Sequence, residues 1–361
     1  MKKISNVAEI VRLAHLTGVP VLVWGPPGVG KTAAIEAAAR DMGLHCETLV
    51  AGWRDPSDVL GYMVPDLSAG TLNVSPTGWA QRLIEAGDSS LLFVDELTTA
   101  PAAVQAALLR VVHERVVADM RLPAGCAIVA AANPADLAAG GEDLTAPLAT
   151  RFHHVEYMPD ALAWAEGFVG YWGCPPRLRL PEDLWQPWRL RIAAFIRRRP
   201  ELLVKVPETD EERGRPWPNP RTWDHVSRVL AAAGAVDPEA VAGSVGNGPA
   251  LELAEYLASL DLPDPEAVLA DPAALVWLPD RSDWVFAVLS AVVARAVADL
   301  TAERWSAAWA VIGSACDAGY TDVACATAAG LARARRPGLP ALPRDLLARI
   351  APVMRAAGML A

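Results

Sequence analysis

The sequence predicts an α/β domain built on a parallel sheet, followed by a helical region, and two observations carry this prediction. Up to residue 158, short runs rich in β-branched and apolar residues alternate with longer amphipathic stretches. This is the order expected when a helix connects each pair of parallel strands. From about residue 159 the strand-like runs fade, and helical patterns continue to the C-terminus.

Five strands and two clear helices are expected before residue 158. The strands are short apolar runs at 19–24, 49–50, 91–94 and 128–131, with a fifth around residue 155. The helices are Ala- and Leu-rich stretches at 32–39 and 102–112, and the second follows Pro101, a residue type favoured in the first turn of a helix. Strands that alternate with helices pair in parallel, so we expect an αβα layered fold.

The second part of the sequence is expected to be all-α. Helices are predicted at 161–168, 188–199, 222–233, 250–260, 284–300, 302–315, 322–335 and 346–357. Proline-rich stretches separate them at 175–187, 206–220, 263–280 and 337–343. We predict three domains: an α/β domain at 1–158, a helical domain at 159–262 and a helical C-terminal extension at 263–361.

The composition is that of a globular protein with a large core, because 53% of the 361 residues are apolar and 20% are charged. The formal net charge of −10 argues against a protein that holds nucleic acid by overall electrostatics.

The five cysteines include no C-x-x-C pair, which favours reduced thiols. The histidines show no metal-ligand spacing, and the adjacent His153 and His154 would face opposite sides of a strand. We see neither a signal-peptide stretch nor an apolar run of the ~20 residues that cross a membrane, so we expect a cytoplasmic protein.

A phosphate-binding loop follows the first predicted strand. It fits the pattern G-x-x-x-x-G-K-S/T and opens the helix at 32–39, which is the context such a loop requires. Its backbone N–H groups can surround an anion, and the helix N-terminus adds a favourable dipole. We expect Lys31 to reach the β- and γ-phosphates of a nucleotide and the Thr32 hydroxyl to bind Mg²⁺. The predicted nucleotide-binding residues here are Gly25, Pro26, Pro27, Gly28, Val29, Gly30, Lys31, Thr32 and Ala33.

Two carboxylates follow the strand at 91–94. Asp95 and Glu96 come at the carboxyl end of this strand, where open α/β sheets bind their ligands. Burying two adjacent acids would be costly without a cation nearby. We expect Asp95 to hold Mg²⁺ together with Thr32, and Glu96 to orient and polarise an attacking water.

Three more polar residues have positions that suit a nucleotide site. Asn133 follows the next strand, and its amide could bond both the γ-phosphate and the water. Arg151 precedes the last strand, where it is either a solvated surface group or an arginine finger for a neighbouring subunit. Arg221 opens a helix of the second part and could cover the nucleotide from that side.

These motifs together resemble an AAA+ ATPase, and within that class its MoxR-type branch. The specific pieces are GPPGVGKT, LLFVDEL, the run at 101–110 and AAANP. The segments 55–62 and 78–79 are similar to the chain that leads into the helix-2 insert of this branch, and 114–122 resembles its hairpin before the next strand. The resemblance covers residues 20–235 well and the C-terminal part poorly.

The resemblance implies a P-loop AAA+ nucleotide domain, a helical lid, ATP and Mg²⁺ as ligands, and ATP hydrolysis. It implies that Asn133 is sensor 1, Arg151 a finger acting in trans and Arg221 sensor 2, beside the catalytic Lys31 and Glu96. In the segment before the finger the family more often has an acid, which is missing here. A finger in trans implies a homo-oligomeric ring, most often a hexamer. The family further suggests chaperone-like remodelling of a protein client with a partner that carries a von Willebrand factor A domain.

Three other functions stay open. A nucleic-acid motor would need basic pore loops, whereas the two candidate insertions at 54–77 and 113–124 are net acidic. An ATP-gated scaffold with little turnover would not need to keep Lys31, Asp95, Glu96 and Asn133 together. A chelatase-type motor subunit for metal insertion into a tetrapyrrole shares the same inserts, so only a partner screen separates it from a chaperone.

Overall fold

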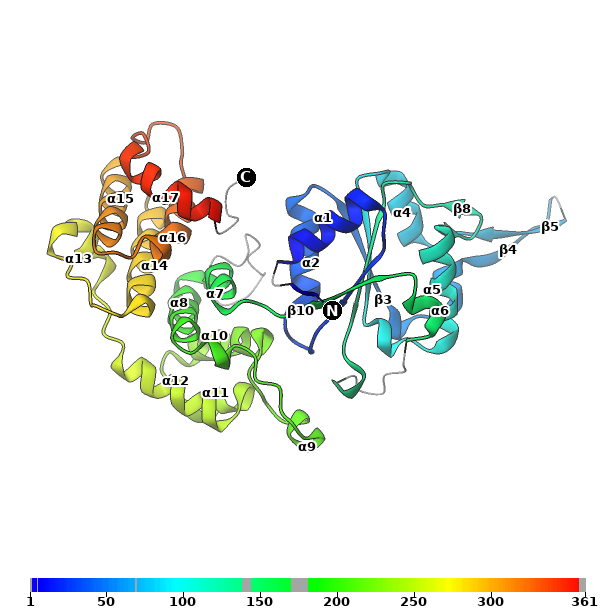
Figure 1. The fold of residues 1–361 in the computed structure, drawn as a ribbon, viewed down its shortest axis with the longest axis horizontal. Coiled ribbons are helices and arrows are strands. Elements are labelled where there is room, and N and C mark those ends of the chain that lie inside the picture. The colour runs from blue at the N-terminus through cyan, green and yellow to red at the C-terminus, as the bar shows by residue number, and fades with distance from the viewer. Residues whose placement is uncertain (1, 5, 69, 138–143, 170–180, 357–361) are drawn as a thin grey trace. The chain divides into compact units, whose positions relative to one another are not determined.

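The computed structural model describes residues 2–4, 6–68, 70–137, 144–169 and 181–356. The chain forms two compact units, Met1–Asp160 and Ala161–Ala361 (Figure 1). The first holds the predicted α/β domain, and the second holds both predicted helical domains. The division of the second unit at 262/263 stays a prediction.

A six-stranded, wholly parallel sheet forms the centre of the first unit. All five predicted strands are present, which confirms the α/β fold class. The sheet differs from the prediction in two ways: the strand expected at 49–50 begins earlier, and one edge strand was not predicted. In spatial order the strands are β1 (Lys2–Ile4), β10 (His153–Tyr157), β2 (Val21–Trp24), β9 (Ala127–Ala132), β6 (Ser90–Asp95) and β3 (His45–Val50).

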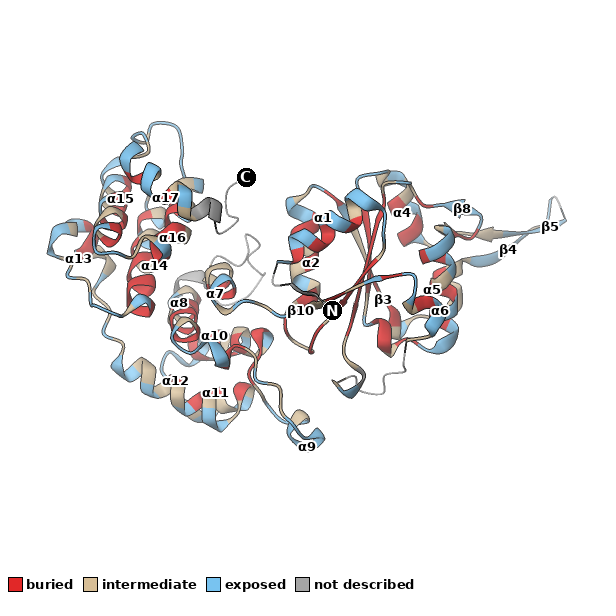
Figure 2. Ribbon diagram, viewed as in Figure 1, coloured by how far each residue is buried: buried red, intermediate tan, exposed pale blue. Residues whose placement is uncertain are grey.

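Helices cover both faces of this sheet, and the strands between them are buried (Figure 2). Because side chains alternate along a strand, each face carries its own set of apolar residues. On one face, strand residues such as Leu22, Leu92 and Ile128 share a buried core with α4 and α5. The main helices of the unit are α1 (Val7–Thr17), α2 (Lys31–Asp41), α4 (Gly78–Ala86) and α5 (Ala102–Glu114), with the short helices α3 (Pro56–Leu60) and α6 (Ala146–Ala149).

Two antiparallel hairpins are inserted into this layered fold. The first consists of β4 (Tyr62–Asp66) and β5 (Thr71–Ser75), and it projects away from the sheet (Figure 1). The second consists of β7 (Val116–Val117) and β8 (Met120–Arg121), which confirms the hairpin predicted at 114–122.

The second unit is a helical domain with one extensive hydrophobic core, which runs from Trp164 to Ile350. None of the helices within the described ranges is long and apolar enough to cross a lipid bilayer. The helices are α7 (Ala161–Val169), α8 (Glu182–Arg198), α9 (Asp210–Arg213), α10 (Pro220–Ala233), α11 (Pro238–Val245), α12 (Asn247–Ser259), α13 (Pro265–Ala270), α14 (Ser282–Ala298), α15 (Ala302–Asp317), α16 (Thr321–Arg333) and α17 (Arg344–Ala356).

Short helices occur where the sequence predicted only breaks or left the chain unassigned. In α11 and α13 a proline occupies the first turn, and the aspartate before it, Asp237 or Asp264, caps the helix. Proline lacks an N–H group, which the first turn of a helix does not need, so it begins these helices instead of ending them. The stretches 206–220 and 263–280, predicted only as interruptions, thus contain the short helices α9 and α13, and α11 forms where no element was predicted.

Six tryptophans of the second unit are buried, as packing between Ala-rich helices favours. They are Trp164, Trp185, Trp223, Trp284, Trp305 and Trp309. Trp172 and Cys174 lie outside the described residues. Burial raises the pKa of the Cys325 thiol to about 11, and it raises the pKa of Cys46 in the first unit to about 11 as well. Both thiols therefore stay protonated at neutral pH.

A buried arginine joins three helices of the second unit. The Arg189 side chain, on α8, is 1% exposed, and its guanidinium donates to the Phe168 carbonyl at the end of α7 and to Asp224 Oδ1 of α10 at 2.7 Å. It also stacks on the Phe168 ring at 3.8 Å from the ring centre. Burying a charge is tolerated only where it is paired and hydrogen-bonded, and these contacts satisfy both conditions.

We expect Arg189→Met to lower the free energy of unfolding by about 3 kcal/mol, because it leaves the Phe168 carbonyl and the Asp224 carboxylate without this partner. Chemical denaturation followed by tryptophan fluorescence measures the change. The matched control is Arg198→Met, at the exposed end of the same helix, which should change stability by less than about 0.5 kcal/mol. Equal effects of the two substitutions would contradict a structural role for the buried guanidinium.

Candidate active site

The candidate site lies at the carboxyl edge of the parallel sheet, where three neighbouring strands end side by side. β9 lies between β2 and β6, and Trp24 of β2 is in register with Ala132 of β9. The phosphate loop follows β2, Asn133 follows β9, and Asp95 ends β6. The sheet therefore brings three separate sequence motifs to one place, as expected for ligand sites of parallel sheets.

The phosphate loop has the backbone that its glycines allow. Gly28 and Gly30 have φ angles of 78° and 91°, in the region that favours glycine. Gly25 lies so close to β10 that a Cβ atom there would come within 2.7 Å of the Tyr157 carbonyl oxygen. Burial raises the pKa of the Tyr157 phenol to about 12, so that residue stays uncharged. Because Gly30 has no side chain to cap α2, the first N–H groups of that helix can serve an anion.

Lys31 is the first residue of α2, and its ammonium lies inside the loop. The residue is 8% exposed, and Nζ donates to the carbonyl oxygens of Gly25 at 2.7 Å and Pro26 at 3.0 Å. Nζ also donates to Asn133 Oδ1 at 2.7 Å. A charge this well buried needs polar partners, and here they hold it between the loop and the end of β9.

The Thr32 hydroxyl donates to Asp95 Oδ2 at 2.6 Å, so a residue of α2 and one of β6 form a pair of oxygen ligands. Oxygen atoms of this kind suit Mg²⁺, which prefers hard ligands and keeps several of its waters. The donor set and the glycine-lined loop thus fit a nucleotide with its magnesium ion. Among the described residues no group of three or more His, Cys, Asp and Glu side chains is placed to bind another metal.

Glu96 has an uncommon backbone conformation for a residue with a side chain, with φ 56° and ψ 42°. Its N–H donates to Asp95 Oδ1 at 2.9 Å, and its carbonyl accepts the Thr99 hydroxyl at 2.8 Å. These bonds hold the turn and leave the Glu96 carboxylate exposed beside Asp95. Strained backbone of this kind concentrates at functional sites.

Thr98 belongs to this site although the sequence did not single it out. It is 2% exposed, and its hydroxyl donates to the Asn133 carbonyl at 3.1 Å. It thereby joins the turn after Asp95 to the residue that contacts Lys31. The sequence feature that could have predicted a role for Thr98 is its position, two residues after the Asp95-Glu96 pair.

Arg151 lies at the amino ends of the parallel strands, whereas the phosphate loop of its own chain lies at their carboxyl ends. It follows α6 and precedes β10, whose first residue, His153, donates its backbone N–H to Pro20 just before β2. Its side chain is exposed, and its guanidinium donates to two neighbours in sequence, Thr150 Oγ1 at 3.1 Å and the Pro147 carbonyl oxygen at 3.5 Å. The sheet therefore does not bring Arg151 together with Lys31 and Asp95 of the same chain.

Three other arginines, Arg221, Arg110 and Arg115, have different surroundings. Arg221 is exposed in the first turn of α10, which Asn219 caps, and it belongs to the second unit. Arg110 forms an exposed ion pair with Glu114, one helical turn away, on the solvated face of α5. Arg115 caps the C-terminus of α5 in a left-handed conformation, and its guanidinium donates to the Cys126 carbonyl oxygen.

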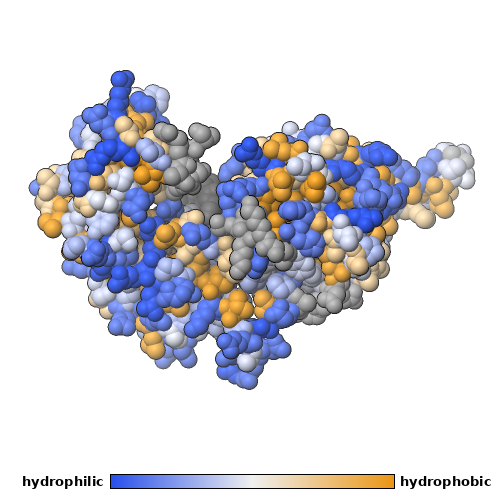
Figure 3. Space-filling model, viewed as in Figure 1, coloured by the Kyte–Doolittle hydropathy of each residue, from blue (hydrophilic) through white to orange (hydrophobic). Residues whose placement is uncertain are grey.

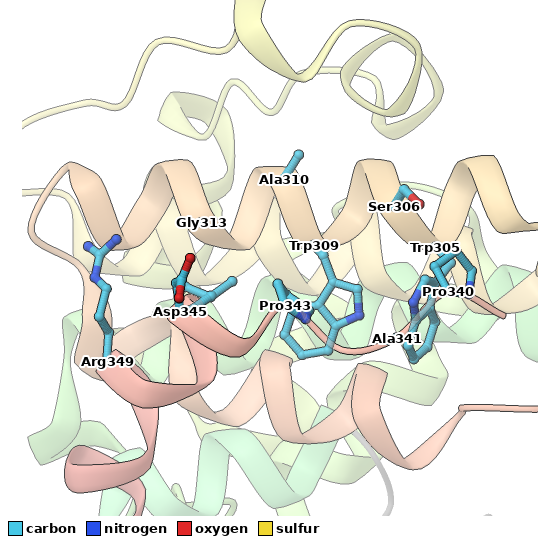
Figure 4. Close-up of a pocket in the computed structure, with 11 residues that line it drawn as sticks. Trp305, Ser306, Trp309, Ala310, Gly313, Pro340, Ala341, Pro343, Asp345 and Arg349 are labelled. Carbon is cyan, nitrogen blue, oxygen red and sulfur yellow. The ribbon is translucent and has the colours of Figure 1, made fainter.

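A cavity of about 460 Å³ lies in the second unit between α15, the segment at 340–343 and α17. Asp345 and Arg349 lie at one end of it, and Trp305 and Pro340 at the other (Figure 4). Arg349 donates to Asp317 at 2.7 Å, so its charge is already paired. The lining brings together no nucleophile with a base, and the strand-end site remains the better candidate for chemistry.

Comparison with known protein families identifies the first unit. Residues 2–155 match a family model described as the MoxR domain in the MoxR-vWA-beta-propeller ternary systems. This part of the chain is a MoxR-type AAA+ domain. The resemblance inferred from the phosphate loop, the Asp-Glu pair and Asn133 is thereby confirmed, and the MoxR domain ends close to the last strand of the sheet.

Among proteins with curated descriptions, none matches the chain. Among solved structures, the chain is similar to a mutant of RuvB from Thermotoga maritima, with 16% identity, 73% of each chain covered and a TM-score of 0.37. It is also similar to a candidate ATPase from Cytophaga hutchinsonii, with 18% identity, 72% of this chain and 91% of that one covered, and a TM-score of 0.35. A structure described as the RuvB Holliday junction branch migration motor of Thermotoga maritima shows 16% identity, with 73% of this chain and 72% of that one covered, and a TM-score of 0.35.

The MoxR domain should lose nucleotide affinity when Gly25 gains a side chain. We expect Gly25→Ala to weaken ATP binding about 10- to 100-fold, because relieving an overpacked contact costs ~1–3 kcal/mol. Isothermal titration calorimetry with ATP measures the dissociation constant. Gly78→Ala is the matched control, since its added Cβ would meet only the flexible end of Arg82, at 3.3 Å. Wild-type affinity in Gly25→Ala would show that the loop does not need this close approach.

Proposed function

We propose that this chain hydrolyses ATP and uses the cycle to remodel a protein client. The observation that carries the proposal is the pair of contacts at the sheet edge, Thr32 with Asp95 and Lys31 with Asn133. Together they assemble the phosphate loop, a magnesium ligand set and a polar sensor from three strands. Membership of the MoxR domain in the AAA+ class supports nucleotide binding by the same residues.

Each side chain has a distinct part in the proposed hydrolysis. The loop amides from Gly25 to Ala33 cradle the phosphates, and Lys31 neutralises charge on the β- and γ-phosphates. Thr32 and Asp95 hold Mg²⁺, which when bound neutralises charge on the transferred phosphoryl group. Glu96 orients and polarises the attacking water, and its exposed carboxylate beside Asp95 suits that task. Asn133 reports the γ-phosphate to the chain because it already contacts Lys31.

Arg151 is far from the nucleotide site of its own chain, which suits an arginine finger that acts on a neighbouring subunit. It lies at the far edge of the sheet from Lys31, it is exposed, and it follows the buried Leu148. We propose that Arg151 stabilises the transition state in a neighbouring subunit, that Arg221 of the second unit acts as sensor 2, and that the chain works as a hexameric ring. The residues 159–262 would then form the lid and 263–361 an extension.

A protein client suits the projecting hairpin better than nucleic acid does. Leu67 is 92% exposed, Met63 75% and Leu72 67%. Figure 3 shows hydrophobic residues on this hairpin, and its strands and turn hold one acid, Asp66, and no Lys or Arg. Exposed apolar surface of this kind marks protein interaction sites, whereas DNA-binding loops need cations. We propose a partner with a von Willebrand factor A domain, as the description of the matched family suggests.

The ATPase rate per chain should rise with protein concentration, because a finger from one chain completes the site of another. We expect Arg151→Ala to lower the rate by ~10³- to 10⁵-fold at every concentration, the contribution of an arginine finger. Steady-state phosphate release over a dilution series measures this. Arg110→Ala, a solvated arginine on α5, is the control and should keep the wild-type rate. An ATPase rate per chain that does not change with concentration and is the same in wild type and Arg151→Ala would contradict a site shared between subunits.

Partner binding should depend on bound ATP. We expect Glu96→Gln to bind ATP, to hydrolyse it at least ~10²-fold more slowly because the water is no longer polarised, and to hold its partner. Co-purification with a protein that carries a von Willebrand factor A domain tests this, with Lys31→Ala as the variant that cannot hold ATP. Equal recovery with both variants would contradict nucleotide-gated partner binding.

A further inference from the structure

We propose that His154 is a positioning residue that fixes the Arg151 turn relative to the phosphate loop of the same chain. It does so as the middle member of a hydrogen-bonded chain that runs from Trp24 through His154 to the Ala149 carbonyl. Trp24 immediately precedes the loop, and Ala149 is the last residue of α6, two positions before Arg151. The inference rests on the proposed trans role of Arg151.

The first link joins two adjacent strands. Trp24 Nε1 donates to His154 Nδ1 at 3.0 Å, and the two rings stack with their centres 6.0 Å apart. β10 and β2 pair in parallel with His154 opposite Leu22, so the indole of Trp24 reaches back by one pleat to meet the imidazole. The link therefore begins at the last strand residue before Gly25.

The second link joins β10 to the turn that carries the finger. His154 Nε2 lies 2.8 Å from the Ala149 carbonyl oxygen. The indole N–H can only donate and a carbonyl can only accept, so Nδ1 must be the acceptor and Nε2 must carry the proton. The neutral imidazole is thus the form that serves both neighbours at once.

Backbone hydrogen bonds also hold the Arg151 turn, among them one from the His153 N–H to the Pro20 carbonyl oxygen at 2.7 Å. The Arg151 backbone N–H bonds the Leu148 carbonyl at 3.1 Å, and the buried Leu148 and Phe152 anchor the chain on either side. The guanidinium itself donates to Thr150 Oγ1 at 3.1 Å and to the Pro147 carbonyl oxygen at 3.5 Å, both on the same turn. The bond from His154 is the side-chain contact that ties this turn to the strand leading into the phosphate loop.

In a ring, the hydrogen-bonded link between the Arg151 turn and the phosphate loop affects two active sites. Each subunit would receive a finger at its phosphate loop from one neighbour and offer its own finger to the other. The distance between the phosphate loop and Arg151 within one subunit thus determines whether the sites at both of its interfaces can be complete at the same time. A misplacement of ~1 Å can lower the rate ~10²-fold. A rigid chain of two hydrogen bonds holds that distance.

Substitutions at His154 test the role directly. We expect His154→Leu to lower the ATPase rate per chain about 10- to 100-fold with little change in ATP affinity, since it misplaces the finger and spares the loop. His154→Gln keeps an acceptor and a donor and should recover most of the rate, whereas a role in packing alone would not distinguish Gln from Leu. Trp24→Phe keeps an aromatic ring without the N–H and should give a smaller loss. His153→Leu, on the exposed neighbouring position of β10, is the matched control and should keep the wild-type rate.

Mixed assemblies show whether the defect lies in the finger. Lys31→Ala chains lack a working site but retain Arg151, so they should restore activity when mixed with inactive Arg151→Ala chains. If His154→Leu acts through the finger, the same Lys31→Ala chains should restore it too.

The outcomes separate the two proposals. Rescue of Arg151→Ala without rescue of His154→Leu, or equal losses in His154→Leu and His154→Gln, would overturn the positioning role and leave the shared site intact. Failure to rescue Arg151→Ala itself would overturn the trans finger, and the positioning role with it. Thermal unfolding shows whether His154→Leu folds. If it does not, the same mixing experiment is done with Trp24→Phe. A Trp24→Phe chain with the wild-type ATPase rate would also overturn the proposal.

Discussion

The parallel pairing of β2, β9 and β6 is the constraint on which the candidate site depends. Each strand delivers a different chemistry to the same edge: an anion-binding loop, an amide and a carboxylate. None of these groups suffices alone, and they are distant in sequence. The bonds from Thr32 to Asp95 and from Lys31 to Asn133 exist because the sheet order places β9 between the other two strands. The helices on both faces exist to bury the strands that carry these residues.

Much of this arrangement can be predicted from the sequence because the site residues lie directly after apolar strands. A run such as residues 91–94 has few alternatives to a buried strand, and a carboxylate after it must lie at the carboxyl edge. The phosphate loop is similarly constrained, since glycines at 25, 28 and 30 are what its close approaches and positive φ angles require. The family membership of the MoxR domain followed from the same residues.

What the sequence did not predict depends on contacts between distant side chains or on edges of the sheet. The edge strand β1 has little apolar signal of its own, because an edge strand is buried on fewer sides. Thr98 and His154 are common residues in ordinary positions, and their bonds to Asn133 and to Trp24 become visible only once the strands are paired. The proline in the first turn of α13 predicted a break in the chain and no element was predicted at α11, whereas in the structure prolines begin both helices. The roles of Arg151 and Arg221 stay predictions.

The projecting hairpin has a further consequence for how the protein behaves at high concentration. A two-stranded ribbon has two open edges, and exposed apolar strands with open edges tend to recruit further strands into aggregates. Pro65 is the fourth of the five residues of β4, where it removes a donor that a third strand would need on that edge. The β4 edge thus resists edge-to-edge pairing, whereas β5, which has no proline, keeps an edge at which a further strand could pair.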